Sequence, residues 1–358
     1  MIRRALIAAL LAVLALPAAA GAAVPRDFFG VMANGPLDQL DFDLASESAR
    51  MRAAGVGTER MEISWDLAEP ARGRYELAPY DRKVLAAATA GIDVLALVVR
   101  SPSWAAAQPG KPFSPPKDPA TYAAFMNAMV ARYGPRGSLW AEHPEVPKRP
   151  VRAWQIWNEP NIVNYWTVQP FMKPYARLLN AAYAAVKGAD RGATVVMAGL
   201  ANFSWRDLAR LYKSARPPRR LRFDVAAVHP FSGRPSNSVK IVRLNREVLD
   251  RNGASQRPIW LTELTWSSAK GRKTPITKDW ETTEAGQATR LRQAFGLFVR
   301  ARRSLRLDRI YWYTWITVDR NSPNSFDYSG LRTLRPDGSV ADKPSARAFR
   351  AVVKRYRR

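Results

Sequence analysis

The sequence contains no cysteine, so the fold uses neither disulfide bonds nor thiolate-bound metal ions. A chain of 358 residues, 47% of them hydrophobic, can form a large core without such cross-links. The same apolar content excludes an intrinsically disordered protein. Because the sequence also lacks linker-like and low-complexity segments, we expect a single folded domain.

After residue 20 the sequence lacks any apolar run long enough to cross a membrane. The first residues, MIRRALIAALLAVLALPAAAGAAV, begin with two arginines, continue with an apolar run from Ala5 to Leu16, and end in small residues. This order is typical of a secretory signal peptide. We therefore expect residues 1–23 to be a cleaved signal peptide and residues 24–358 to form a secreted, extracellular domain. The alternative is a retained N-terminal membrane anchor.

Acidic residues are few: 30 Asp and Glu stand against 56 Lys and Arg, which gives a net charge of +26. Basic residues cluster at 216–222, at 300–309 and at the C-terminal KRYRR. This charge favours an anionic partner such as an acidic polysaccharide or a cell-envelope glycan. The alternative is a compositional bias spread over solvated helix faces. Since no recognised nucleic-acid-binding motif accompanies the charge, we expect no specific nucleic-acid partner.

Short runs rich in β-branched and aromatic residues alternate with amphipathic helical patterns along the chain. Strands are predicted at 28–34, 56–64, 93–99, 151–157, 194–199, 224–228, 258–263 and 309–315. Helices are predicted at 39–54, 78–90, 119–133, 174–189, 204–215, 237–252, 283–304 and 343–355. Eight strand-then-helix units predict an α/β fold, a single (β/α)8 TIM barrel. An open doubly wound sheet is less favoured, because no glycine-rich phosphate loop follows the first strand.

Polar side chains lie at the C-terminal ends of several predicted strands. Arg60 lies on the second strand, Asn158 and Glu159 follow the fourth, His229 follows the sixth, and Glu263 ends the seventh. In a (β/α)8 barrel these strand ends meet at one face, where active sites lie. Two carboxyls facing across a cleft can cleave a glycosidic bond, one as a proton donor and the other as an ionised group at the sugar carbon. Like-charge repulsion and apolar surroundings separate their pKa values.

Four segments resemble clan A of the retaining glycoside hydrolases: WNEPN at 157–161, IWLTELTW at 259–266, VHPF at 228–231 and ERMEISWDLAEP at 59–70. Within that clan the sequence looks most similar to the cellulase-like families and the β-xylosidase/α-L-iduronidase family. The resemblance implies a (β/α)8 barrel that acts on a carbohydrate. It implies that Glu159 is the general acid/base, Glu263 the nucleophile and Asn158 the amide that contacts the sugar 2-hydroxyl. It also implies that Arg60 pairs with the nucleophile and that His229 lines the cleft.

Aromatic residues near the strand ends are candidates for sugar contacts. Trp104 follows the third strand, and Trp166 lies in the loop after the fourth. The resemblance matches Trp315, or else Trp312, to the strand-8 aromatic beneath the sugar. Half of such loop aromatics serve only to pack the loops.

The sequence departs from the clan pattern at Phe231, where many relatives have a tyrosine whose hydroxyl contacts the nucleophile. Either Tyr311 or Tyr313 supplies that hydroxyl, or Glu263 relies on Arg60 alone. We expect no cofactor and no metal, since the acidic neighbours of His143 do not have the spacing of a ligand set. A barrel that binds glycan without cleaving it is the alternative function.

Overall fold

The computed structural model describes residues 23–39, 41–215, 220–272 and 280–357. Apart from residue 23, the predicted signal peptide lies outside the described residues, as does part of the basic cluster at 216–222. Among the described residues, none of the helices has both the length and the apolar composition needed to cross a membrane.

Eight parallel strands form the central sheet of the molecule. They are β1 (Phe29–Met32), β2 (Thr58–Ser64), β3 (Asp93–Val99), β4 (Ala153–Ile156), β5 (Thr194–Met197), β6 (Ala226–Val228), β7 (Ile259–Leu264) and β8 (Leu307–Trp312). Their order is β5-β4-β3-β2-β1-β8-β7-β6. The two end strands meet through parallel bridges from Val196 to Val225 and from Leu200 to Val228. The sheet is therefore nearly closed, and the predicted (β/α)8 barrel is confirmed.

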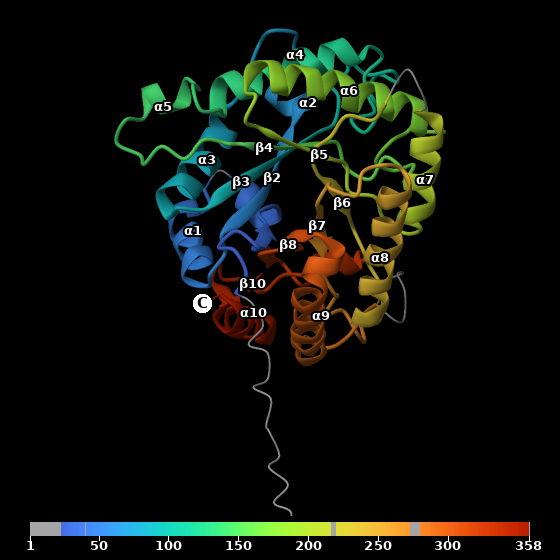
Figure 1. Ribbon diagram of the computed structural model, residues 1–358. Coiled ribbons are helices and arrows are strands. Elements are labelled where there is room, and N and C mark those ends of the chain that lie inside the picture. Colours follow the sequence, from blue (N-terminus) through green and yellow to red (C-terminus); the bar gives the residue numbers. More distant parts are fainter. Residues whose placement is uncertain (1–22, 40, 216–219, 273–279, 358) are drawn as a thin grey trace, which may run out of the picture.

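Helices surround the strands in chain order, as Figure 1 shows. They are α1 (Leu44–Ala53), α3 (Ala78–Ala90), α4 (Pro119–Tyr133), α6 (Met172–Ala189), α7 (Ser204–Ser214), α8 (Pro235–Arg251), α9 (Glu284–Leu305) and α10 (Pro344–Tyr356). Two single-turn helices, α2 (Trp65–Ala68) and α5 (Leu139–Glu142), lie in connecting segments. The start of α4 shows why the bounds were predictable: Asp118 accepts a hydrogen bond from the Ala120 N–H, and Pro119 occupies the first turn.

The segment after β8 contains structure that the sequence analysis treated as a long loop. It forms a small sheet of β9 (Ile316–Thr317), β10 (Arg332–Leu334) and β11 (Val340–Asp342). The short 3-10 helix η2 (Ser325–Tyr328) lies between β9 and β10 in the sequence. An Asp337-Gly338 turn joins β10 to β11, with Gly338 at a φ of 80°. Asp-Gly is a recognised hairpin signal, but strands of two or three residues are too short to show an alternating pattern.

The barrel interior has an apolar part and a polar part. A separate buried cluster within the strands contains Leu95, Ala153, Val196, Val225, Ala227, Trp260 and Tyr311. Because side chains alternate along a strand, Thr58, Arg60 and Glu62 of β2 all point to the same side. Thr58 meets the apolar cluster through a 3.0 Å hydrogen bond between its Oγ1 and the Tyr311 hydroxyl. Arg60 and Glu62 come later on β2 and lie closer to the C-terminal face of the barrel.

Candidate active site

A cavity of about 370 Å³ opens at the C-terminal ends of the strands. This volume is at the small end of the range for small-molecule sites in proteins. Its polar lining consists of Asn34, Arg60, Glu62, Asn158, Glu159, Asn164, Asn202, Glu263 and Asn324. Its aromatic lining consists of Phe113, Tyr165, Phe231, Tyr313 and Phe326.

The two predicted catalytic carboxyls face each other in this cavity. Glu159 is 6% exposed and Glu263 is 7% exposed, so both are largely removed from bulk water. One carboxylate oxygen of Glu159, one of Glu263 and one ring nitrogen of His229 all lie within 4.8 Å of one another. Carboxyl groups about 5–5.5 Å apart are typical of glycosidases that use a covalent intermediate, whereas separations of about 6.5–9.5 Å leave room for a water.

Arg60 is the centre of the hydrogen bonds at this site. Its Nη1 donates to Glu263 Oε1 at 2.6 Å, its Nη2 to Asn158 Oδ1 at 2.8 Å, and its Nε to Gln155 Oε1 at 2.7 Å. The Arg60 side chain is fully buried, and the Glu263 carboxylate offsets its charge. Because Asn158 Oδ1 is occupied by Arg60, the Asn158 NH₂ group is oriented as the donor toward a ligand.

Glu159 contacts His229, with 2.6 Å between Oε1 and Nδ1. Burial raises the pKa of Glu159 to about 7, although the positive charge of Arg60 acts in the opposite direction. Burial also lowers the pKa of His229 to about 4, while the Glu263 charge opposes that shift. At neutral pH, His229 is therefore uncharged, and Glu159 holds its proton to a higher pH than an ordinary carboxyl. A carboxyl in this state can donate a proton at physiological pH.

A chain of hydrogen bonds links the two carboxyls through the barrel interior. His229 Nε2 lies 2.9 Å from Thr262 Oγ1, and Gln155 Nε2 donates to the same oxygen at 3.2 Å. Gln155 then accepts from Arg60, which binds Glu263. Gln155 and Thr262 were not predicted as site residues. The available signal is a polar residue inside a mostly apolar strand: Gln155 in VRAWQIW, and Thr262 next to Glu263 in PIWLTE.

The backbone after β4 is unusual on both sides of Asn158. Trp157 has a φ of 69° and Glu159 a φ of 40°, and the left-handed region costs a non-glycine residue roughly 1–3 kcal/mol. The Trp157 indole N–H donates to the Tyr165 carbonyl at 2.6 Å, and the Glu159 N–H donates to the Gly199 carbonyl at 3.1 Å. These contacts hold the turn that places the side chains of Asn158 and Glu159 in the cavity.

Gly199 is required because a side chain at this position would occupy the space of the His229 imidazole. A Cβ at this position would lie 2.0 Å from His229 Nε2. The imidazole could not then stay between Glu159 and Thr262. The small residue after β5 therefore permits the buried position of His229.

None of the three tryptophans predicted to bind substrate lines this cavity. Trp166 is fully buried and packs edge-to-face on Trp157 at 5.2 Å. Trp315 is also buried, and its indole N–H donates to Glu47 Oε2 at 2.8 Å. Trp104 is partly exposed, but its indole N–H donates to the Glu69 carbonyl at 3.1 Å outside the cavity. The large indole rings fill the space between the loops and the barrel instead.

Tyr313 is the strand-8 aromatic that reaches the cavity. Burial and the neighbouring Glu263 charge raise the pKa of Tyr313, and its hydroxyl hydrogen-bonds the Asn34 side chain. Tyr311 lies deeper and bonds Thr58. Of the two tyrosines considered from the sequence, Tyr313 is therefore the one positioned near the predicted nucleophile.

Glu159, His229 and Glu263 are also the group that could hold a metal ion, since their ligand atoms converge within 4.8 Å. Two carboxylates and an imidazole are a known ligand set for divalent cations. Here, however, Glu263 Oε1 is paired with Arg60 and Glu159 Oε1 is paired with His229. A cation would have to replace these bonds beside a fixed guanidinium charge, so the donor set fits acid/base chemistry better.

The chain matches no family model and no curated protein sequence. Its structure is similar to a family 39 glycoside hydrolase from the gut symbiont Bacteroides cellulosilyticus WH2, with a TM-score of 0.65 and 22% identity over 92% of this chain. A GH5_18 protein from Bifidobacterium longum subsp. infantis gives a TM-score of 0.62 and 18% identity over 92% of this chain and 79% of that one. An exo-β-1,4-mannosidase from Opitutaceae bacterium strain TAV5 gives a TM-score of 0.61 and 15% identity over 94% of this chain.

The chain spans 64% of the length of the family 39 protein and 61% of that of the mannosidase. At these identities the comparisons show a shared fold. The predicted resemblance to clan A glycoside hydrolases is thereby confirmed at the level of the barrel. The roles of individual residues stay predictions that rest on the geometry of the site.

Proposed function

We propose that this protein is a retaining glycoside hydrolase that cleaves O-glycosidic bonds of a poly- or oligosaccharide by double displacement. The observation that carries the proposal is the pairing of Glu159 and Glu263. One oxygen of each carboxyl lies within 4.8 Å of the other, and Glu159 lies beside an uncharged imidazole while Glu263 lies beside a guanidinium. This arrangement gives the two carboxyls different protonation states, which the two roles require.

In the first step the sugar lies in the cavity with its anomeric carbon next to Glu263. Glu159 gives its proton to the glycosidic oxygen, the bond from that oxygen to the anomeric carbon breaks, and the Glu263 carboxylate bonds to the carbon. Arg60 holds Glu263 through Oε1 during this attack. The Asn158 NH₂ group, fixed by Arg60, donates to the sugar 2-hydroxyl, a contact that strengthens in the transition state.

In the second step the ionised Glu159 removes a proton from water, and the resulting oxygen bonds to the anomeric carbon. The bond to Glu263 breaks, Glu263 leaves as a carboxylate, and Glu159 is protonated again. Two inversions give net retention of configuration. Proton NMR of an aryl glycoside reaction tests this directly, because the first-formed sugar should keep the anomeric configuration of the substrate. A protein that binds glycans but turns over none of a broad aryl glycoside panel would support the binding-barrel alternative.

We also propose that the protein is secreted after removal of its N-terminal segment, as the sequence RRALIAALLAVLALPAAA suggests. The mature protein is expected to begin between Gly21 and Pro25. N-terminal sequencing of protein recovered from culture medium measures this. An intact Met1 in a membrane fraction would instead identify the segment as an anchor.

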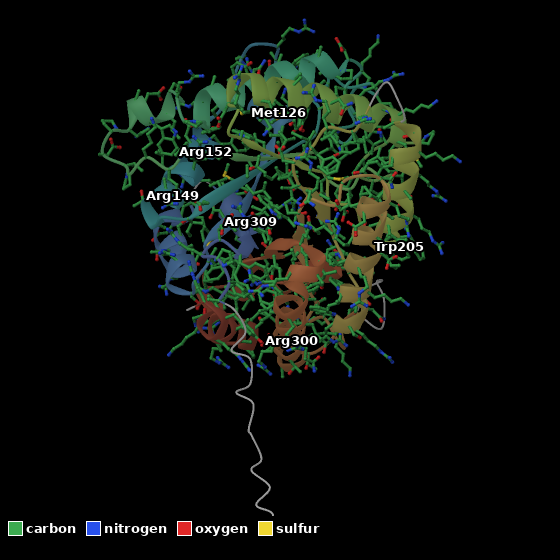
Figure 2. All side chains as sticks on the ribbon, viewed as in Figure 1. Met126, Arg149, Arg152, Trp205, Arg300 and Arg309 are labelled. Atoms are coloured by element: carbon green, nitrogen blue, oxygen red, sulfur yellow. The ribbon has the colours of Figure 1, made fainter. Side chains whose placement is uncertain are left out.

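The positive charge has a location that supports an anionic partner. We define the basic face as Arg26, Arg52, Lys148, Arg149, Arg152, Arg309 and Arg357. These residues lie at the N-terminal ends of strands or the C-terminal ends of helices, opposite the cavity. Lys148, Arg149, Arg152 and Arg309 line a hollow of about 430 Å³. Figure 2 shows Arg149, Arg152 and Arg309 near one another in this region.

Arg149 pairs with Asp93 and Arg309 pairs with Asp27, but other cations of the basic face have neutral partners. Arg26 donates to the Gly91 carbonyl, and Arg357 donates to the Gly55 carbonyl at 2.7 Å, so both guanidiniums have neutral partners. Burial and the neighbouring charges of Arg26 and Arg149 lower the pKa of Arg52. Mutually repelling cations gain from a polyanion that bridges them. We propose that the basic face binds an acidic polysaccharide or cell-envelope glycan.

Binding to polygalacturonic acid should fall steeply between low salt and ~0.5 M salt, whereas cleavage of an uncharged aryl glycoside should change little. Replacing Lys148 and Arg152 together by Gln should weaken that binding about 30-fold, on the scale of about 1 kcal/mol for each cation near an anionic surface. The matched control is Lys111→Gln with Lys117→Gln, two exposed lysines in the loop after β3. Equal effects of the two double variants would assign the charge to compositional bias.

A further inference from the structure

Glu62 is a third carboxyl in the cavity that the proposed mechanism does not use. It lies on β2 two residues after Arg60, so both side chains point into the barrel. It lines the same cavity as Glu159 and Glu263. A partly buried carboxyl without a catalytic task in such a site needs another explanation.

The surroundings of Glu62 leave it able to accept hydrogen bonds from a ligand. The Ser64 hydroxyl donates to Oε1 at 2.8 Å, and among the described residues this is the one hydrogen bond found on the carboxyl. The nearest charges are Arg60, which pairs with Glu263, and Arg100, which pairs with Asp66 at 3.2 Å. Among the described residues, no hydrogen bond is therefore found on Oε2, and Glu62 lines the cavity.

A third neighbouring charge, Asp38 of η1 (Gly35–Asp38), is negative and, like burial, raises the pKa of Glu62. Asp38 is bound to Lys83 at 2.5 Å, so its carboxylate is already paired. Burial is the main cause that raises the pKa of Glu62, with Asp38 acting in the same direction and Ser64 in the opposite one. A second anion brought against Glu62 would act in the same direction as Asp38 and disfavour the charged carboxylate further.

We propose that Glu62 accepts hydrogen bonds from hydroxyl groups of the sugar ring in the cavity, and thereby selects an uncharged sugar over a uronic acid. The proposal rests on the proposed glycosidase function and names its substrate class. Carboxylate oxygens only accept hydrogen bonds, which matches the hydroxyl donors of a sugar ring. The amides of Asn34, Asn164, Asn202 and Asn324 add neutral partners around the same cavity.

The charge balance of the cavity supports the same conclusion. Among the described residues its lining has one cation, Arg60, against the carboxyls of Glu62 and Glu263, even when Glu159 is protonated. A sugar carboxylate would meet two like charges and a guanidinium that is already paired with Glu263. The excess positive charge of the chain lies on the basic face at the other end of the barrel. Binding of an anionic polymer and selection of the cleaved sugar are therefore separate functions of separate surfaces.

The experiment compares pairs of aryl glycosides that differ only at the C6 position, a hydroxymethyl group in one and a carboxylate in the other. Wild-type kcat/KM should favour the uncharged member at least ~100-fold, on the scale of losing or opposing a hydrogen bond to a charged group. Glu62→Gln keeps the shape but loses the charge. It should lower kcat/KM for the uncharged member about tenfold and raise it for the uronide, so that the ratio between the two collapses.

Glu76→Gln is the matched control, because Glu76 has a 61% exposed side chain outside the cavity and should leave the ratio unchanged. Glu62→Ala, checked for folding by its melting temperature, should lose activity on the uncharged sugar without gaining any on the uronide. A wild-type preference for the uronide, or a Glu62→Gln ratio equal to that of Glu76→Gln, overturns the proposal.

Calorimetric titration of the same variants with neutral and uronic-acid oligosaccharides gives a readout independent of turnover. If the protein cleaves no glycoside, the proposed function fails, while the binding preference still decides the role of Glu62. If it cleaves uronides best, the glycosidase stands and the Glu62 proposal fails.

Discussion

Replacing Glu263 by Ala is expected to abolish turnover of every glycoside that the wild-type protein cleaves. Loss of the attacking carboxylate prevents formation of the glycosyl-enzyme, so kcat should fall by on the order of 10⁵-fold, the scale seen when a covalent nucleophile is removed. The loss should be the same for good and poor leaving groups, since no substrate can supply the missing bond. Steady-state kinetics on a series of aryl glycosides with different phenols measures it.

The design must separate loss of chemistry from loss of structure. Glu263→Ala leaves the fully buried Arg60 without its carboxylate, and an unpaired buried charge costs roughly 3–5 kcal/mol of stability. Glu263→Gln keeps the shape and a hydrogen-bond acceptor for Arg60, so it should fold normally and remain inactive. Glu247→Ala, a surface glutamate on α8, controls for the substitution itself.

Added azide provides the decisive check on the Glu263→Ala variant. A small anion can occupy the vacated space and attack the anomeric carbon, while Glu159 still donates its proton to the leaving group. The product should be a glycosyl azide of inverted configuration. More than ~1% residual activity in the absence of azide would remove Glu263 from the nucleophile role.

The barrel was predictable because each of its units shows its pattern locally. The structure confirms the predicted bounds of β3, α3 and α4 without change. Strand β3 is apolar from Val94 to Val99. Helix α4 has one apolar face, and it begins with Asp118 as the N-cap and Pro119 in the first turn. The sheet of β9, β10 and β11 was missed, since its strands are too short to show a period and pair only through distant segments.

The polar centre of the site was equally predictable, and its walls were not. Arg60, Asn158, Glu159, His229 and Glu263 lie at strand ends, and the barrel brings strand ends together whatever the loops do. Which loop side chain faces the cavity depends instead on contacts far away in the sequence. Trp315, for example, donates a hydrogen bond to Glu47, which lies 268 residues earlier in the sequence. Tyr313 lines the cavity at the place that was predicted for Trp315.

Buried polar partners were missed for a third reason. Gln155 is the one polar residue of β4 and Thr262 precedes Glu263 in β7, and neither identity gives a sign of what the side chain binds. Only the closed barrel places them between His229 and Arg60. The local pattern therefore reveals the polar groups at the strand ends, while the groups that hold them require the three-dimensional structure.

Replacing Glu159 by Ala should separate the two steps of the reaction. Substrates with poor leaving groups need the proton from Glu159 and should lose about 10²–10⁴-fold in kcat/KM. A dinitrophenyl glycoside needs no proton, so its first step should proceed at near the wild-type rate. The covalent intermediate on Glu263 should then accumulate, because no base activates the water that releases it. Rapid-mixing experiments should show a burst of dinitrophenol, and mass spectrometry should find the sugar attached to Glu263.

Azide and pH test the same role independently. Azide needs no general base, so it should restore turnover of Glu159→Ala and yield a glycosyl azide with the configuration of the substrate, opposite to that formed by Glu263→Ala. In the wild type, kcat/KM for a poor leaving group should fall as pH rises through about 7, since the pKa of Glu159 is raised to about 7 by burial. That alkaline limb should be absent from the residual activity of Glu159→Ala on the same poor-leaving-group substrate. If it persists, or if azide gives no rescue, another group is the acid and the pairing of Glu159 with His229 serves only to hold the loop.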